Sequence, residues 1–300
     1  MLKSLNFYDL RGSFHTERMW DHFNHGNHFC IILEYLNNFK ATKLDKLAEI
    51  REIARHLLKC ISLVHCLGII HADLKPDNIM KTSQEWKIVD FGNSCFLENI
   101  NSYYEDFQIQ SLRYRAPEVL SGIPFGLEID MWSMGCILSE FYLGRQLFCK
   151  SNPREMLLEI SCICGPFPSM YQKGIFFDSS FETVEYEMLY HRISTLKQIF
   201  DTRDYYFVDF IARMLFLDPQ QRLKAEEALH HPFLRASTEI SIFPTQLMFT
   251  REYRSEKSSP KKRNRGPKKL DQKRDRSPVS VTDRSVLEIV RQIEEDYVDM

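Results

Sequence analysis

Residues 71–78 read HADLKPDN, and they place Asp73, Lys75 and Asn78 at spacings of two and three residues. Turn formation alone offers one explanation, because Pro, Asp and Asn are favoured in turns. That explanation predicts turn residues in any order, and it does not predict the motifs that follow further along the chain. The octapeptide is therefore the point from which the fold and the chemistry of the chain can be worked out.

The segments on either side of the octapeptide are a helix and a strand. From Lys46 to Leu67, apolar residues recur at helical spacing, and Gly68 follows as a stop signal. Downstream, Trp86–Val89 reads as a short strand that ends at Asp90. The octapeptide is therefore predicted to be a loop between a long amphipathic helix and a strand.

The rest of the body is predicted to be mainly helical. Residues 29–36, FCIILEYL, form a short apolar run that reads as a buried strand. Residues 130–142 are apolar nearly all round, which indicates a helix at the centre of a domain. Residues 206–217 have helical periodicity until Asp218-Pro219 breaks it. This texture predicts a fold of the α+β class.

Several short motifs follow the octapeptide in a fixed order. They are DFG at 90–92, APE at 116–118, DMWS at 130–133, and Arg222 within DPQQR. Each motif alone is weak, but the ordered set, placed on loops and element ends, is specific. The set matches what phosphoryl transfer requires, because that reaction depends on positioning and charge neutralisation.

Each polar residue of the set has a chemical role to which it is suited. Asp73 can accept a hydrogen bond from an attacking hydroxyl, and Lys75 can neutralise charge on the moving phosphoryl group. Asn78 and Asp90 offer hard oxygen ligands for Mg²⁺, and Gly92 gives the backbone freedom beside the metal. We also expect a buried, structural ion pair between Glu118 and Arg222.

On these motifs the chain resembles a eukaryotic protein kinase over about residues 2–235. The segments QSLRYRAPEVL and DFGNSC are similar to the CMGC group, in particular to the dual-specificity tyrosine-regulated kinases. Three segments, HFNHGNHFCIILEYL, HADLKPDN and SMYQKGIFFD, resemble more closely the pre-mRNA-processing factor four kinases, which are splicing kinases.

The resemblance implies a protein serine/threonine kinase fold that is mainly the helical C-lobe. It implies a remnant of the N-lobe and hinge at 1–36, the C-lobe at 37–236, and a C-terminal extension at 237–300. It implies ATP and Mg²⁺ as cofactors, protein substrates that include splicing factors, and a nuclear location that extends to the cytoplasm. Glu34 and Leu36 are implied to bind adenine at the hinge, Leu33 to be the gatekeeper, and Ser111 to lie near Asp73 and Lys75.

The sequence also departs from the family pattern. Ala72 stands where the family usually has Arg, so this position cannot pair with a phosphate in the activation loop. Gln108 and Leu112 stand where the related kinases have Tyr and Arg, although Arg115 remains. We therefore expect activation without phosphorylation of a tyrosine at position 108.

The largest departure concerns the Gly-rich loop and the strand lysine of a kinase N-lobe. The chain contains no GxG pair, and before Glu34 its only Lys is Lys3. Two interpretations stay open: the chain is a truncated form of an active kinase, or it is a kinase-like scaffold that has lost catalysis. The intact set of Asp73, Lys75, Asn78 and Asp90 favours the first interpretation.

Charge divides the chain into two parts. Residues 251–278 hold twelve Lys or Arg against four Asp or Glu, a net charge of +8, so the rest carries −10 of the overall −2. We expect this basic stretch to be disordered and to act as a nuclear import signal. The alternative is a nucleic-acid-binding protein that uses this stretch. A short helix is predicted at 285–294.

The same composition excludes a membrane protein. No apolar run approaches the roughly 20 residues of a membrane span, and the N-terminus lacks the apolar core of a signal peptide. The eight Cys are scattered, as in a reduced intracellular protein.

Overall fold

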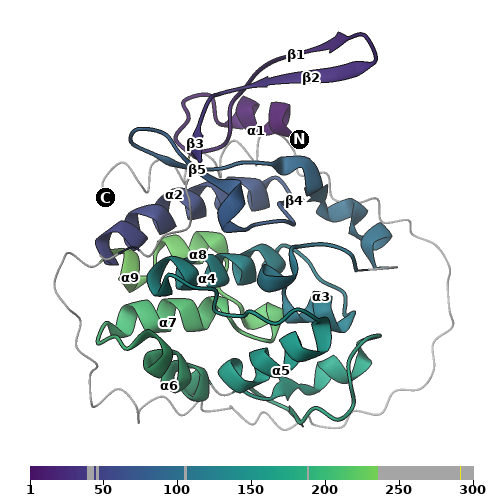
Figure 1. The fold of residues 1–300 in the computed structure, drawn as a ribbon, viewed down its shortest axis with the longest axis vertical. Coiled ribbons are helices and arrows are strands. Elements are labelled where there is room, and N and C mark those ends of the chain that lie inside the picture. Colours follow the sequence, from purple (N-terminus) through teal and green to yellow (C-terminus); the bar gives the residue numbers. More distant parts are fainter. Residues whose placement is uncertain (39–43, 45–46, 105–106, 188, 236–290, 292–300) are drawn as a thin grey trace, which may run out of the picture.

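The computed structural model describes residues 1–38, 44, 47–104, 107–187, 189–235 and 291. Helices dominate these residues and form a stacked body beneath a projecting two-stranded hairpin (Figure 1). The helices are α1 (Leu2–Tyr8), α2 (Leu47–Cys66), α3 (Pro117–Ser121), α4 (Glu128–Leu143), α5 (Pro153–Cys164), α6 (Leu189–Phe200), α7 (Tyr205–Met214), α8 (Ala225–Leu229) and α9 (Pro232–Arg235). Short 3₁₀ turns lie between them, among them Leu97–Tyr103 and Leu112–Tyr114.

The strands form small, separate sheets. The antiparallel pairs are β1–β2 and β4–β7, β8 and β9 are parallel, and a three-stranded sheet has the order β3-β5-β6. The strands are β1 (Met19–His25), β2 (His28–Leu33), β3 (Asn37–Asn38), β4 (Ile69–Ile70), β5 (Ile79–Lys81), β6 (Trp86–Ile88), β7 (Cys95–Phe96), β8 (Phe167–Pro168) and β9 (Thr183–Val184). The predicted α+β class, mostly helical with little sheet, is confirmed.

The core is organised around α4, which is buried along nearly its whole length as its apolar sequence predicts. Trp132 of α4 is fully buried and stacks on Phe148. Gly135 allows α7 to approach closely, because a Cβ there would lie 3.0 Å from the side chains of Met214 and Leu215. Helix α4 is therefore the rigid element against which the other helices are placed.

The predicted helix at 46–67 is confirmed as α2, and its apolar face is buried. Gly68 follows with φ +64°, the left-handed conformation that ends helices. Arg51 of α2 bonds to Asp204 at 3.0 Å and to the carbonyl of Phe233 at 3.0 Å, which joins α2 to the starts of α7 and α9. The helix predicted at 206–217 is α7, which ends earlier, at Met214.

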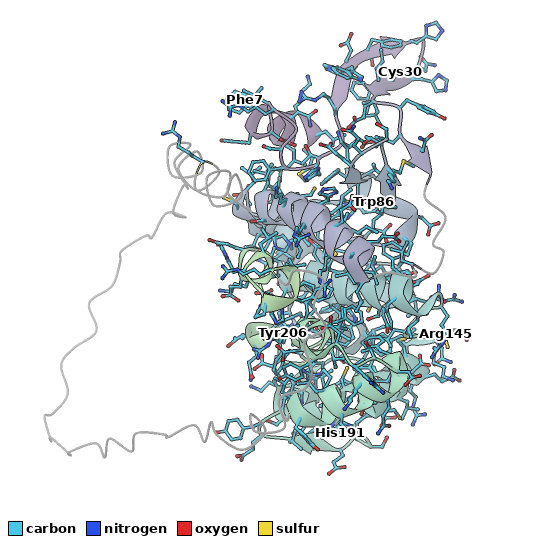
Figure 2. All side chains as sticks on the ribbon, turned by 90° about the vertical axis from the view of Figure 1, so that its left-hand side faces the viewer. Phe7, Cys30, Trp86, Arg145, His191 and Tyr206 are labelled. Atoms are coloured by element: carbon cyan, nitrogen blue, oxygen red, sulfur yellow. The ribbon has the colours of Figure 1, made fainter. Side chains whose placement is uncertain are left out.

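The prediction of a buried strand at 29–36 is wrong in one respect. Strand β2 forms at His28–Leu33, but its side chains are largely exposed: Phe29 is 63% and Ile31 48% accessible. Among the described residues β2 pairs only with β1. Figure 2 shows this hairpin, with Cys30 labelled, extending away from the body. An apolar run predicts a strand, but burial depends on partners.

A cavity of about 360 Å³ lies where α2 ends, where α4 begins, and beside α8. His65 and Cys66 line it from α2, Met131 lines it from α4, and Lys224 and Ala225 line it from the opposite side. Its walls therefore come from segments that are far apart in the sequence.

Some predictions lie outside the described residues. They are the basic disordered stretch at 251–278 and nearly all of the helix at 285–294, of which only Arg291 is described. Within the described residues, no helix combines the length and apolarity needed to cross a bilayer. All eight Cys are described, and none forms a disulfide.

Candidate active site

The octapeptide loop is fixed to the buried helix α4 by one carboxylate. Asp130 accepts hydrogen bonds from the backbone N–H groups of His71, at 2.8 Å, and Ala72, at 3.0 Å. The imidazole of His65, at the end of α2, lies 3.0 Å from the same carboxylate. Asp130 is fully buried, so this anchor is shielded from water and holds the loop in one place.

His71 holds the loop through hydrogen bonds at both nitrogens of its imidazole ring. Its Nδ1 accepts the N–H of Asp73 at 3.3 Å, so Nε2 donates to the carbonyl of Val89 at 3.1 Å. Complete burial lowers the pKa of His71, which agrees with this neutral form. The ring thereby connects the loop to the end of β6.

The carboxylate of Asp73 is the centre of the site. Lys75 Nζ lies 2.6 Å from Oδ2, and Ser111 donates to Oδ1 from its hydroxyl at 2.8 Å and from its backbone N–H at 3.2 Å. Lys75 Nζ also lies 3.4 Å from the Ser111 hydroxyl. The structure therefore brings together Asp73, Lys75 and Ser111, as the sequence predicted.

Asp73 is held in its ionised form. Burial alone raises the pKa of Asp73, but the hydrogen bonds from Lys75 and Ser111 outweigh it, so the pKa lies below its ordinary value. An ionised carboxylate beside a lysine can accept a hydrogen bond from a hydroxyl group and orient it.

The two predicted metal ligands lie side by side at the ends of β5 and β6. The N–H of Val89 donates to the carbonyl of Asn78 at 3.0 Å, which places Asp90 next to Asn78. The Asn78 amide nitrogen donates to the carbonyl of Asp73 at 2.8 Å, so its amide oxygen is the atom available to a metal. Asp90 is exposed and has φ +61°.

This donor set fits Mg²⁺. The ion keeps several waters and needs only one or two carboxylates beside the phosphates of a substrate. The described residues contain no cluster of three or more His, Cys, Asp or Glu side chains that could hold a metal ion. A Cβ at Gly92 would lie 3.0 Å from Asp90 Oδ1, a close contact.

Ala72 and Arg115 hold the stretch between the DFG and APE motifs through hydrogen bonds to its backbone. The carbonyl of Ala72, a residue with φ +69°, accepts the N–H of Gln110 at 3.0 Å. The Arg115 guanidinium donates to the carbonyl of Gln110 at 2.7 and 3.2 Å. Position 72 thus contributes main-chain bonds, and Arg115 binds backbone oxygen.

The predicted Glu118–Arg222 ion pair is confirmed. Arg222 donates to both carboxylate oxygens of Glu118, at 2.6 and 2.9 Å, and both side chains are fully buried. This bidentate pair joins the APE motif to the segment before α8, away from the Asp73 carboxylate.

The predicted hinge residues follow β2 directly. The carboxylate of Glu34 accepts two hydrogen bonds from Lys87 Nζ, at 2.7 and 2.9 Å, and one from the backbone N–H of Arg18, at 2.7 Å. Leu36 is 9% exposed, whereas Leu33 is 38% exposed. Adenine contact by Glu34 and Leu36 stays a prediction.

Sequence reasoning missed two residues of the site. Asn93 donates its side-chain amide to Asp73 Oδ2 at 3.3 Å. Gln110, which is buried, bonds through its side chain to Ser133 at 2.8 Å and to the N–H of Ala116 at 3.0 Å. Asn93 directly follows the DFG motif, and this adjacency was the one available signal.

Comparison with known proteins agrees with this geometry. The protein kinase domain family matches residues 11–234. Similar proteins include Dual specificity tyrosine-phosphorylation-regulated kinase 2 of Drosophila melanogaster, which is 35% identical over 79% of this chain. They also include Dual specificity tyrosine-phosphorylation-regulated kinase 4 of Homo sapiens, 32% identical over 81% of the chain, and Dual specificity protein kinase CLK1 of Mus musculus, 30% identical over 78%.

The chain spans 35%, 50% and 56% of the lengths of these three relatives, respectively. All three relatives are protein kinases by name, and the match to the kinase domain covers both the hairpin and the helical body. The sites found from the sequence, at residues 71–78, 90–92 and 116–118, all lie inside the matched range. The chain therefore belongs to the protein kinase domain family, with relatives in the CMGC group.

Proposed function

We propose that the protein is a serine/threonine kinase that transfers the γ-phosphoryl group of ATP to hydroxyl groups of proteins. The observation that carries the proposal is the arrangement around Asp73. An ionised carboxylate and a lysine at 2.6 Å lie in the loop that also carries Asn78, and the hydroxyl of Ser111, from a later segment, lies 2.8 Å from that carboxylate. This is the positioning and charge neutralisation on which phosphoryl transfer depends.

The residues divide the work as follows. Asp73 accepts the hydrogen bond of the substrate hydroxyl and orients its oxygen toward the γ-phosphorus. As the new O–P bond forms and the bond to the ADP oxygen breaks, Asp73 receives the proton and Lys75 offsets negative charge on the transferred group. Asn78 and Asp90 would hold Mg²⁺, which neutralises phosphate charge when it is bound.

The test uses two separate single variants of the 300-residue chain, Asp73→Asn and Asp90→Asn. Each change keeps the side-chain shape and removes a negative charge, so we expect loss of phosphoryl transfer with the fold retained. Transfer from radiolabelled ATP to a mixed protein substrate measures activity, and circular dichroism with thermal unfolding measures folding.

Asp21→Asn serves as the control, because Asp21 lies exposed on the hairpin and the same change there should leave activity intact. Wild-type turnover in either site variant contradicts the proposed roles. Absence of turnover in the wild-type chain, with the fold intact, contradicts transfer by these 300 residues and is expected both of a truncated kinase and of a kinase-like scaffold.

We further propose that the substrates are splicing factors and that the protein acts in the nucleus. The support is the likeness of residues 22–36, 71–78 and 169–178 to the pre-mRNA-processing factor four kinases, and the basic stretch at 251–278. Deletion of 251–278 should abolish nuclear accumulation of a fluorescent fusion. Proteins whose phosphorylation depends on an intact Asp73 should include splicing factors, and a set without them contradicts the substrate proposal.

The basic stretch also allows nucleic-acid binding, the alternative reading of the sequence. Phosphate contacts by Lys and Arg weaken steeply as salt rises. RNA affinity that falls with salt and vanishes when 251–278 is deleted supports this alternative, and binding that is absent or insensitive to salt excludes it.

A further inference from the structure

Hydrogen bonds from neighbouring groups occupy all the acceptor positions of the Asp73 carboxylate. An ionised carboxylate has about four positions at which it accepts hydrogen bonds, two on each oxygen. Oδ1 accepts two bonds from Ser111, at 2.8 and 3.2 Å, and Oδ2 accepts one from Lys75, at 2.6 Å, and one from Asn93, at 3.3 Å. A substrate hydroxyl can bond to Asp73 only if one of these donors leaves.

The four donors are not equally easy to displace. The backbone N–H of Ser111 is fixed by the main chain, and its hydroxyl bond is short, at 2.8 Å. The Lys75 bond is shorter still and charge-assisted, so it is about twice as strong as a neutral one. Asn93 makes the longest of the four bonds, is uncharged, and has an exposed side chain.

Asn93 also borders the space from which a substrate approaches. A polar cavity of about 330 Å³ opens directly beside Asp73, and its walls include Asn93, Tyr103, Gln108 and Ser111. The Asn93 amide can therefore rotate into open space, whereas the other donors to Asp73 are held by the loop or by charge.

From these contacts we infer that the Asn93 amide occupies the place of the substrate hydroxyl on Asp73 Oδ2 and leaves when the substrate binds. Asn93 is a positioning residue: it keeps the carboxylate oriented in the free protein, and it reduces the net gain from the incoming hydroxyl. The inference rests on the proposed role of Asp73 as the group that receives that hydroxyl.

The test compares two degenerate peptide mixtures that differ only in a central Ser or Ala. The ratio of their dissociation constants, measured by fluorescence anisotropy, reports what the hydroxyl contributes to binding. In the wild-type chain this ratio is expected to be small, because the hydroxyl must displace Asn93. Asn93→Ala should raise the ratio by about twofold to tenfold, the worth of one neutral hydrogen bond.

Asn93→Leu keeps the side-chain size but cannot donate, and it should change the ratio in the same direction. Asn101→Ala is the matched control, since Asn101 is an exposed asparagine of the same segment and does not line the cavity.

The outcomes of this test separate the inference about Asn93 from the proposed kinase activity. A raised ratio supports the inference, even if the wild-type chain transfers no phosphate, in which case the proposed function fails separately. An unchanged ratio in both Asn93 variants overturns the inference.

Discussion

At the scale of single residues, the ion pair between Glu118 and Arg222 matters for stability because each buried charge depends on the other. Both groups are fully buried, and Arg222 also donates to the carbonyl of Phe216. Removing one charge leaves the other buried without a partner. Glu118→Gln should therefore lower the free energy of unfolding by about 3–5 kcal/mol, measured by urea denaturation.

The exposed pair of Arg154 and Asp178 provides the control for this prediction. Its nitrogen and oxygen lie 2.8 Å apart, but the arginine side chain is 64% exposed, so water screens the attraction. Asp178→Asn should lower the free energy of unfolding far less than Glu118→Gln does. Equal losses of unfolding free energy at the two sites would show that burial does not determine the cost of breaking an ion pair.

The residues of the site differ in how far the sequence could predict them. The motif spacing placed Asp73 and Lys75 in one loop, and the kinase resemblance added Ser111; the structure confirms that these three side chains meet. Asn93 could not be predicted in the same way, because adjacency to a motif does not fix the direction of a side chain. Its contact with Asp73 depends on the 3₁₀ turn that the chain makes after Asp90.

At the scale of elements, two histidines whose rings are in contact join the N-terminal segment to α2. The rings of His15 and His56 lie 4.2 Å apart, and the N–H of Trp86 donates to Nδ1 of His56 at 3.2 Å. Burial, followed by nearby positive charges, lowers the pKa of His15 to about 3 and of His56 to about 4. Both rings are therefore neutral in the folded protein at neutral pH.

This pair predicts how stability depends on pH. In the unfolded chain both histidines titrate near 6.5, so the unfolded state takes up protons first as the pH falls. Stability should be complete above about pH 6.5 and should decline as the pH falls toward 4. His56→Asn, which keeps an acceptor for Trp86 without titrating, should reduce the difference in Tm between about pH 7.5 and pH 5.

His25 and His28, which lie exposed on the hairpin, serve as controls for the histidine effect. Substituting either by Asn should leave the pH dependence of Tm unchanged. If His56→Asn also leaves it unchanged, the acid sensitivity of the fold comes from groups other than His15 and His56.

The elements show what periodicity in a sequence can and cannot predict. Helices α2 and α4 are predicted well, because their patterns are long and the buried face follows from spacing alone. Strand β2 is predicted as a strand but not as exposed, because six residues carry no information about which layers cover them. The wrong part of the prediction thus concerned tertiary partners.

At the scale of the whole molecule, the hairpin carries several exposed apolar side chains. Trp20 is 65% exposed, Phe29 63% and Ile31 48%. Exposed apolar side chains promote association, and the open edges of a two-stranded sheet add unpaired backbone groups. We expect the 300-residue chain to self-associate at micromolar concentration, as measured by sedimentation velocity.

Replacing Phe29 and Ile31 together by Thr should shift the chain toward the monomer, since Thr keeps the strand preference and removes apolar area. Leu158→Thr is the matched control, because Leu158 is a scattered exposed residue on α5, 41% accessible. If the control dissociates the assembly as well as the double variant does, the hairpin is not the contact surface.

The cavity between α2, α4 and α8 has a consequence for inhibitor chemistry. Its wall includes His65, whose imidazole shares the Asp130 carboxylate with the backbone of the loop that carries Asp73. A small molecule bound against that ring would disturb the loop through the Asp130 carboxylate, and it would not need to resemble a nucleotide. Such a molecule could contact the side chains of Cys66, Met131 and Lys224 in the wall.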